Sequence, residues 1–128
     1  MNLQWYNTLN KPFLTPPAKI FMPAWMVLYI LIFTSLLLYM NAKTTENKTL
    51  GYIAFIIQLI LNFSWSPVFF QFQNIGLSFI IILLLTISII VTIIYFSRVS
   101  KISAILLIPY LLWAIFAMYL NYGIMKLN

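Results

Sequence analysis

The sequence predicts an all-α integral membrane protein, a helical bundle with four transmembrane helices. The first observation is an uncharged run of 49 residues between Lys48 and Arg98, interrupted only by a polar cluster at 71–74. A helix needs about 20 apolar residues to cross the hydrocarbon core of a bilayer, so this run is long enough for two crossings and a turn. The second observation is composition, because 64% of the residues are hydrophobic and only 6% are charged.

Two further uncharged runs flank the long one, at 20–42 and 102–125. Backbone polar groups in hydrocarbon must bond internally, which leaves helices or closed barrels, and these runs lack the alternation of a barrel strand. We therefore expect a multi-pass protein with one domain over 1–128. Its predicted helices cover about 20–41, 50–70, 75–96 and 103–125.

The first 19 residues are polar and rich in proline, without the apolar core of a signal peptide. We expect this segment, 1–19, to remain as an irregular lid before the first helix. That helix tolerates Pro23, because proline suits the first turn. The connection that follows, 43–48, is the most polar stretch of the chain.

In the helix predicted at 50–70, Pro67 removes a backbone hydrogen bond near the end, so we expect a bent or frayed last turn. The helix at 75–96 is rich in isoleucine and has only Ser and Thr as polar groups. It is therefore expected to face lipid more than the other three helices.

The fourth helix, 103–125, carries Pro109 in its first half. Tyrosines near helix ends commonly form a belt at the membrane interface. This is the expected role of Tyr39, Tyr95 and Tyr122.

The charged residues restrict the function. The seven basic side chains lie at helix ends or in loops and form no clustered patch, which argues against a nucleic-acid partner. Three basic residues on one side against four on the other do not decide the orientation. The chain has no His and no Cys, and its only carboxylate side chain, Glu46, lies in a loop. We therefore predict no metal site, no cofactor and no conventional catalytic residues.

Polar and aromatic side chains at membrane depth indicate a binding site. Gln58, Asn62 and Ser66 recur every four residues and so share one helix face, with Trp65 beside it.

The fourth and first helices present matching faces. Trp113, Ala117 and Asn121 share a face of the fourth helix, and Trp25 and Tyr29 lie one turn apart in the first. These groups are typical of a mostly apolar cavity with a few orienting polar groups. The alternative is that the amides only link helices, at about 0.6 kcal/mol each, and the sequence leaves both interpretations open.

Five segments carry a resemblance to a known family. The segment 5–12, Trp-Tyr-Asn-Thr-Leu-Asn-Lys-Pro, is followed by Thr-Pro-Pro at 15–17 and Trp-Met-Val-Leu-Tyr at 25–29. This order resembles the opening of the TspO/MBR family of tryptophan-rich sensory proteins and translocator proteins, once called the peripheral benzodiazepine receptor. The segments 58–67 and 107–121 are similar to that family's third and fifth helices.

The resemblance implies a membrane receptor or sensor that binds flat hydrophobic ligands, such as porphyrins or other tetrapyrroles. It places the protein in a bacterial cell membrane or an organelle membrane, in tetrapyrrole-linked regulation, with light-dependent breakdown of protoporphyrin as a further activity of some members. Any such photochemistry would rely on the indoles. By motif, the implied ligand-binding residues are Trp25, Trp113, Tyr6 in the lid, Gln58, Asn62 and Ala117.

The family's first helix precedes the lid motif, whereas here the lid motif begins at Trp5. Two interpretations stay open: the sequence begins at an internal methionine, or the protein is a four-helix variant. In a four-helix variant the missing helix would expose polar faces, so we expect a homodimer or higher oligomer, or a compensating rotation of helices. The family orientation places the lid and the carboxyl terminus in the cytoplasm.

A weaker pattern suggests sterol or lipid as a further partner. Leu120, Tyr122 and Lys126 fit a loose cholesterol motif, which a belt tyrosine and a snorkelling lysine explain equally well. The alternative function is a small membrane transporter or channel-like carrier of porphyrin, sterol or lipid. It ranks second because the chain shows no internal repeat and no charge within a helix.

Overall fold

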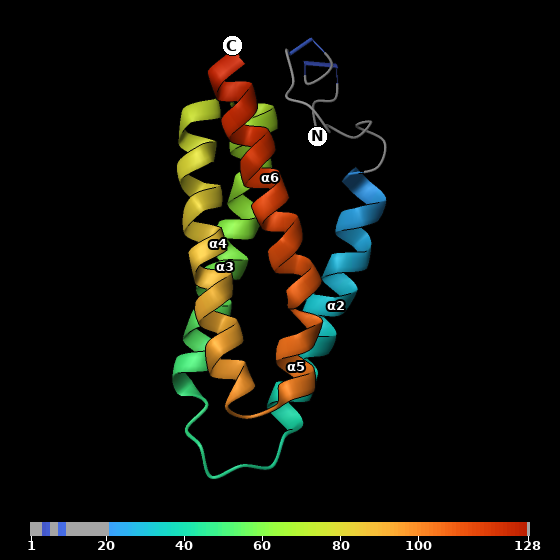
Figure 1. The fold of residues 1–128 in the computed structure, drawn as a ribbon, viewed down its shortest axis with the longest axis vertical. Coiled ribbons are helices and arrows are strands. Elements are labelled where there is room, and N and C mark those ends of the chain that lie inside the picture. Colours follow the sequence, from blue (N-terminus) through green and yellow to red (C-terminus); the bar gives the residue numbers. More distant parts are fainter. Residues whose placement is uncertain (1–3, 6–7, 10–20, 128) are drawn as a thin grey trace.

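The computed structural model describes residues 4–5, 8–9 and 21–127 and shows an elongated helical bundle (Figure 1). Most of the segment predicted as a lid, including Tyr6, lies outside the described residues. No strand occurs in the described ranges. The elements are α2 (Phe21–Asn41), α3 (Thr49–Ser66), the π-helical turn η2 (Pro67–Gln71), α4 (Ile75–Ser97), α5 (Lys101–Leu106) and α6 (Ile108–Leu127).

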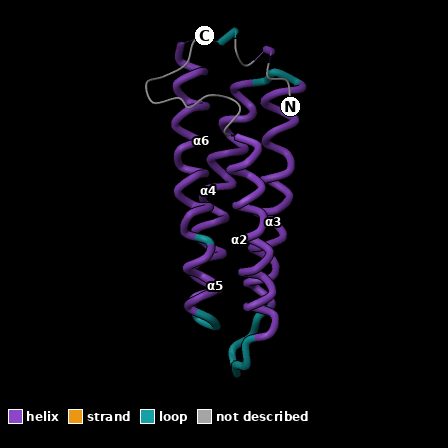
Figure 2. Tube along the Cα trace, turned by 90° about the vertical axis from the view of Figure 1, so that its right-hand side faces the viewer, coloured by secondary structure: helices purple, strands orange, loops and turns teal. Residues whose placement is uncertain are grey.

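Among the described residues, four stretches of helix are long and apolar enough to cross a membrane, which confirms the predicted multi-pass bundle. Figure 2 shows these rods running along one common axis. Each boundary lies within two residues of its predicted position because the thickness of the bilayer fixes the length of the apolar run. The spans are Met22–Asn41, Thr49–Gln71, Ile75–Ser97 and Lys101–Leu127.

The prediction that the isoleucine-rich helix faces lipid most is wrong. In the most apolar window of α4, 39% of the residues are buried, against 22% in α2. α4 packs against α3, α5 and α6, whereas α2 packs mainly against α5. Apolar residues suit lipid and neighbouring helices equally, so composition could not identify the buried helix.

Pro67 changes the geometry of the end of α3, as expected from its missing N–H. The chain widens into the π-helical turn η2, in which the Phe72 N–H donates to the Pro67 carbonyl five residues earlier, at 3.0 Å. The two consecutive residues Phe69 and Phe70 are both buried there. The wide turn therefore directs two adjacent rings into the bundle.

Pro109 divides the fourth span into two helices, where the sequence predicted one continuous helix. α5 ends at Leu106 and α6 begins at Ile108, and the Leu107 N–H donates to the Ala104 carbonyl at 3.1 Å. Because Pro109 has no N–H, the Ile105 carbonyl lacks its helical donor, and the chain tightens at Leu107.

α2 is attached to α5 through two serines. The Ser35 hydroxyl donates to the Ser103 carbonyl at 2.7 Å, and the Ser103 hydroxyl donates to the Ser35 carbonyl at 2.6 Å. Both serines are fully buried. Small residues allow helix backbones to approach closely in membranes, and the reciprocal bonds hold these two together.

Tyr39 fastens the same end of α2, and the prediction that it is a belt residue is wrong. It is 1% exposed, stacks on Phe96 with ring centroids 3.9 Å apart, and donates its hydroxyl to the Lys48 carbonyl at 3.0 Å. Proximity to a helix end suggested the interface, but the ring turns inward between helices.

Candidate functional site

Three indoles from three helices meet in the bundle, where Trp65 is buried and Trp25 and Trp113 are half-buried. The Trp25 ring of α2 lies 6.4 Å from that of Trp65 in α3 and 6.1 Å from that of Trp113 in α6, measured between centroids. The Trp25 and Trp113 planes are nearly perpendicular, at 86°. Trp25 and Tyr29 also contact, at 5.8 Å, as their spacing of one turn predicted.

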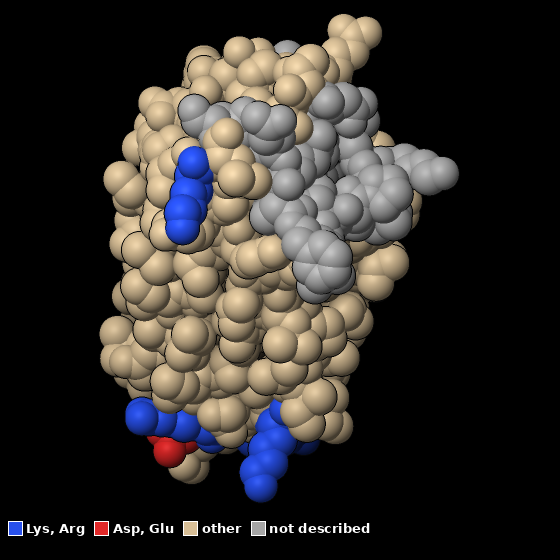
Figure 3. All heavy atoms as spheres, turned by 45° about the horizontal axis from the view of Figure 1, so that its top comes forward, with Lys and Arg blue, Asp and Glu red and all other residues tan. Residues whose placement is uncertain are grey.

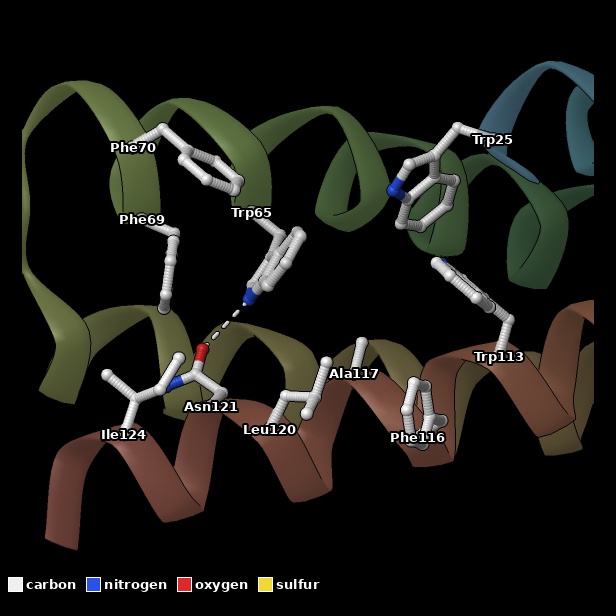
Figure 4. Close-up of a pocket in the computed structure, with 10 residues that line it drawn as sticks. All are labelled: Trp25, Trp65, Phe69, Phe70, Trp113, Phe116, Ala117, Leu120, Asn121 and Ile124. Carbon is white, nitrogen blue, oxygen red and sulfur yellow. Dashed lines mark hydrogen bonds between the residues drawn. The ribbon is translucent and has the colours of Figure 1, made fainter. Parts of the chain in front are cut away.

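The indoles line a small enclosed space, which we call the indole cavity (Figure 4). Its volume is about 20 Å³, which is room for roughly one water molecule. The walls are aromatic and aliphatic apart from one amide. They comprise Trp25, Trp65, Phe69, Phe70, Trp113, Phe116, Ala117, Leu120, Asn121 and Ile124.

Two larger hollows adjoin the indole cavity. The α2–α3 hollow, about 230 Å³, shares the walls Trp25 and Trp65 with it. The α2–α6 hollow, about 490 Å³, shares Trp113 and Phe116. The walls that the cavity shares with the two hollows are therefore all aromatic rings. The combined volume of the two hollows lies within the range of drug-sized ligand sites.

Polar groups beside the α2–α3 hollow form a directed series of hydrogen bonds across three helices. The Tyr29 hydroxyl donates to Asn62 Oδ1, Asn62 Nδ2 donates to the Tyr110 hydroxyl, and that hydroxyl donates to Gln58 Oε1, each at 2.6 Å. Gln58 is the last residue of this series of hydrogen bonds, and its Nε2 atom is buried and makes no hydrogen bond within the described ranges. Asn62 and Tyr29 also line the α2–α3 hollow, so they can face a guest there.

Asn121 holds helices together as well as lining the cavity. Its Oδ1 accepts from Trp65 Nε1 at 3.0 Å (Figure 4) and from the Ser78 hydroxyl at 2.9 Å, and its Nδ2 donates to the Ile75 carbonyl at 3.1 Å. These bonds join α6 to α3 and α4. The amide also fixes the Trp65 ring in the cavity wall.

The structure brings most of the predicted site residues together. Trp25, Trp113, Ala117 and Asn121 line the indole cavity, and Tyr29 and Asn62 line the adjoining hollow. Gln58 lies behind them in the hydrogen-bond chain.

In the weak sterol pattern, Leu120 faces away from Tyr122 and Lys126. Leu120 is buried against the indole cavity, whereas Tyr122 is 48% exposed beside Phe79 and Lys126 is exposed at the end of α6.

Sequence reasoning missed several aromatic walls, namely Phe69, Phe70 and Phe116. Phe69 lies one turn after Trp65, which was a usable signal. The π-helical turn that also buries Phe70 was not predictable from spacing. Within the described part of the lid segment, Trp5 contacts Phe69 edge-on at 5.5 Å and so reaches the wall of the cavity. No cluster of His, Cys, Asp or Glu that could hold a metal occurs among the residues searched.

Comparison with known proteins identifies the family. The TspO/MBR family model matches residues 1–127. The chain belongs to the TspO/MBR family. It is 42% identical over 125 residues to the tryptophan-rich protein TspO of Chlorobaculum tepidum, covering 97% of this chain and 79% of that protein.

Other relatives of the chain come from archaea and animals. The tryptophan-rich protein TspO of Archaeoglobus fulgidus is 42% identical over 127 residues, 97% of this chain and 80% of the relative. The human translocator protein is 33% identical over 128 residues, 98% of this chain and 76% of the relative. Membership of a sensor and translocator family agrees with the membrane bundle described above.

Proposed function

We propose that this chain is a membrane receptor for planar hydrophobic ligands such as porphyrins. The observation that carries the proposal is the meeting of three indoles from α2, α3 and α6 around the indole cavity. Indole faces bind flat aromatic surfaces by offset stacking, and they exclude water from the guest. The TspO/MBR family, whose members include sensory and translocator proteins by name, supports a role in ligand sensing.

The cavity volume of about 20 Å³ does not admit a porphyrin, so binding requires the rings to move. Trp25, together with Trp65, lies between the indole cavity and the α2–α3 hollow, and Trp113, together with Phe116, lies between the cavity and the α2–α6 hollow. Displacing the Trp25 and Trp113 indoles would join the three spaces. Tyr29 and Asn62 would then present polar atoms to the rim or substituents of the guest.

Binding is tested by titrating protoporphyrin into the detergent-solubilised protein and following the shift of the porphyrin absorption band. We expect a saturable shift, and replacing Trp25 and Trp113 by Ala should weaken binding by roughly tenfold or more for the pair, since each aromatic contact contributes about 0.5–1.5 kcal/mol beyond area burial. Tyr122→Phe, on the exposed side of α6, is the matched control. A linear, unsaturable shift, or equal affinity in the double variant, would refute the proposal.

Transport and photochemical breakdown are separate activities that the same site could support. Assays on protein reconstituted into liposomes distinguish transport and breakdown from binding alone. Porphyrin loss under illumination that depends on Trp25 and Trp113 would establish breakdown, and light-independent flux across the vesicle wall would establish transport. Saturable binding without either result leaves the receptor proposal intact.

A further inference from the structure

A long apolar groove lies on the outside of the bundle, away from the indole cavity. It runs between α3 and α4, has a volume of about 590 Å³, and is almost wholly apolar. The small side chains Ala54 and Ser88 lie along its floor, and the exposed side chains Ile57 and Ile87 form part of its rim. We call it the α3–α4 groove.

The groove is as long as one leaflet. On α3 it extends from Leu50 to Leu61, and on α4 from Leu84 to Tyr95. Eleven residues of helix extend roughly 16 Å, which is about half of the ~30 Å hydrocarbon core. It therefore runs from one membrane surface to the middle of the bilayer, which matches one lipid acyl chain and is shorter than a crossing helix.

Positive charge lies at the outer end of the groove. Leu50 and Tyr95 line this end, and the Arg98 guanidinium carbon lies 5.5 Å from the Tyr95 ring centroid, in a cation–π contact. Figure 3 shows Lys and Arg side chains gathered at one end of the molecule, beside an acidic side chain. At this end Lys43, Lys48, Arg98 and Lys101 stand against the single carboxylate of Glu46.

Arg98 is the basic group best placed to meet a headgroup above the groove. The Lys48 ammonium already donates to the Met40 and Ala42 carbonyls, at 3.0 and 2.8 Å, so it is committed to the connection between α2 and α3. A guanidinium binds phosphate oxygens in a bidentate manner. A lipid phosphate without a compensating ammonium group complements the excess positive charge.

We propose that the α3–α4 groove binds an anionic phospholipid, with one acyl chain along Ala54 and Ser88 and the phosphate on Arg98. This site is distinct from the indole cavity and does not depend on the receptor proposal. The lipid would fill the groove between α3 and α4 and would hold this side of the bundle at a set depth in one leaflet.

Native mass spectrometry of the full chain, released from nanodiscs of mixed phosphatidylglycerol and phosphatidylcholine, tests the headgroup. We expect retained phosphatidylglycerol in preference to phosphatidylcholine. Arg98→Gln should reduce that preference roughly fivefold, whereas Lys126→Gln, which removes the same charge at the opposite end of the bundle, should leave it unchanged. Equal effects of the two variants, or no preference in the natural protein, would overturn the proposal.

A second pair of variants tests the groove itself. Ile87→Trp should fill the groove and reduce retained lipid, while Ile90→Trp adds the same ring to an exposed site of the same helix that does not line the groove. Both changes lie on the outer surface, so folding is not at risk from core overpacking. If Ile87→Trp instead dissociates a dimer and leaves lipid retention unchanged, the groove belongs to a second copy and the lipid proposal fails.

Discussion

At the scale of single residues, Tyr39 packs closely against Gly51. A Cβ atom added to Gly51 would meet the Tyr39 hydroxyl oxygen and lie 2.7 Å from Cζ of that ring. The ring cannot withdraw easily, because it is stacked on Phe96 and bonded to the Lys48 carbonyl. Glycine at 51 therefore makes room for the tyrosine that fastens the end of α2.

Gly51→Ala should destabilise the protein by about 1–3 kcal/mol, because the added methyl group overpacks a rigid contact. Gly76→Ala is the matched control, since its added Cβ would meet only Asn74 Oδ1 at an ordinary 3.9 Å. Alanine there should leave stability unchanged or raise it by about 0.5–1 kcal/mol. Reversible unfolding in mixed micelles measures both. Equal stability of the two variants would contradict the fit described here.

The hydrogen-bond chain gives a second residue-scale prediction. Tyr110→Phe removes the donor to Gln58 and the acceptor for Asn62, so it should cost about 1–2 kcal/mol of unfolding free energy. Tyr29→Phe removes only the outer donor and should cost about 0.6 kcal/mol. The same micelle unfolding assay compares the two variants. A larger loss of unfolding free energy in Tyr29→Phe than in Tyr110→Phe would show that the series of hydrogen bonds does not depend mainly on Tyr110.

At the scale of elements, the two interrupted helices shape the site. η2 carries Phe69 and Phe70 into the bundle, and the break at Leu107 allows α5 to pack on α2 while α6 presents Trp113 to the cavity. The sequence predicted the disturbance at Pro67, where a backbone donor is lost, but the helix over 103–125 was expected to continue through Pro109. The sequence does not show how the backbone compensates, since that depends on the neighbouring helices. The burial of α4 escaped prediction for the same reason.

Pro67→Ala should return the missing donor to the Phe63 carbonyl and favour an ordinary α-helical turn over 67–71. Phe69 and Phe70 could then no longer both face inward, and protoporphyrin affinity should fall roughly threefold to tenfold. Pro23→Ala, in the first turn of α2, is the control, because proline at that position costs no helical bond. Unchanged affinity in Pro67→Ala would show that the site does not need the wide turn.

At the scale of the whole molecule, the bundle was predictable from the sequence because bilayer thickness sets the length of each apolar run. The site faces were predictable too, as the four-residue spacing put Trp113, Ala117 and Asn121 on one wall. The hydrogen-bond partner of each polar side chain was not predictable from the sequence. Asn121 proved to bond Trp65, Ser78 and Ile75, which only the packed helices reveal.

The four spans of the described residues place the connection between α2 and α3 on the opposite side of the membrane from the end of α6. Because the chain has no cysteine, single reporters at Glu46→Cys and Lys126→Cys can be labelled without background. In sealed vesicles an impermeant maleimide should modify only one of the two, and opening the vesicles should make both reactive. Modification of both in intact vesicles would contradict the four-span arrangement.

The serine pair and Tyr39 attach α2 to its neighbours near one end, and the Tyr29–Asn62 hydrogen bond attaches it to α3 one turn from Trp25. Trp25 lies ten residues from Ser35, or roughly 15 Å along the helix. A rotation of α2 by about 10° about Ser35 would move the indole of Trp25 by roughly 2.6 Å, close to one water diameter. A small tilt of α2 would therefore shift the Trp25 ring, which is a shared wall of the indole cavity and the α2–α3 hollow.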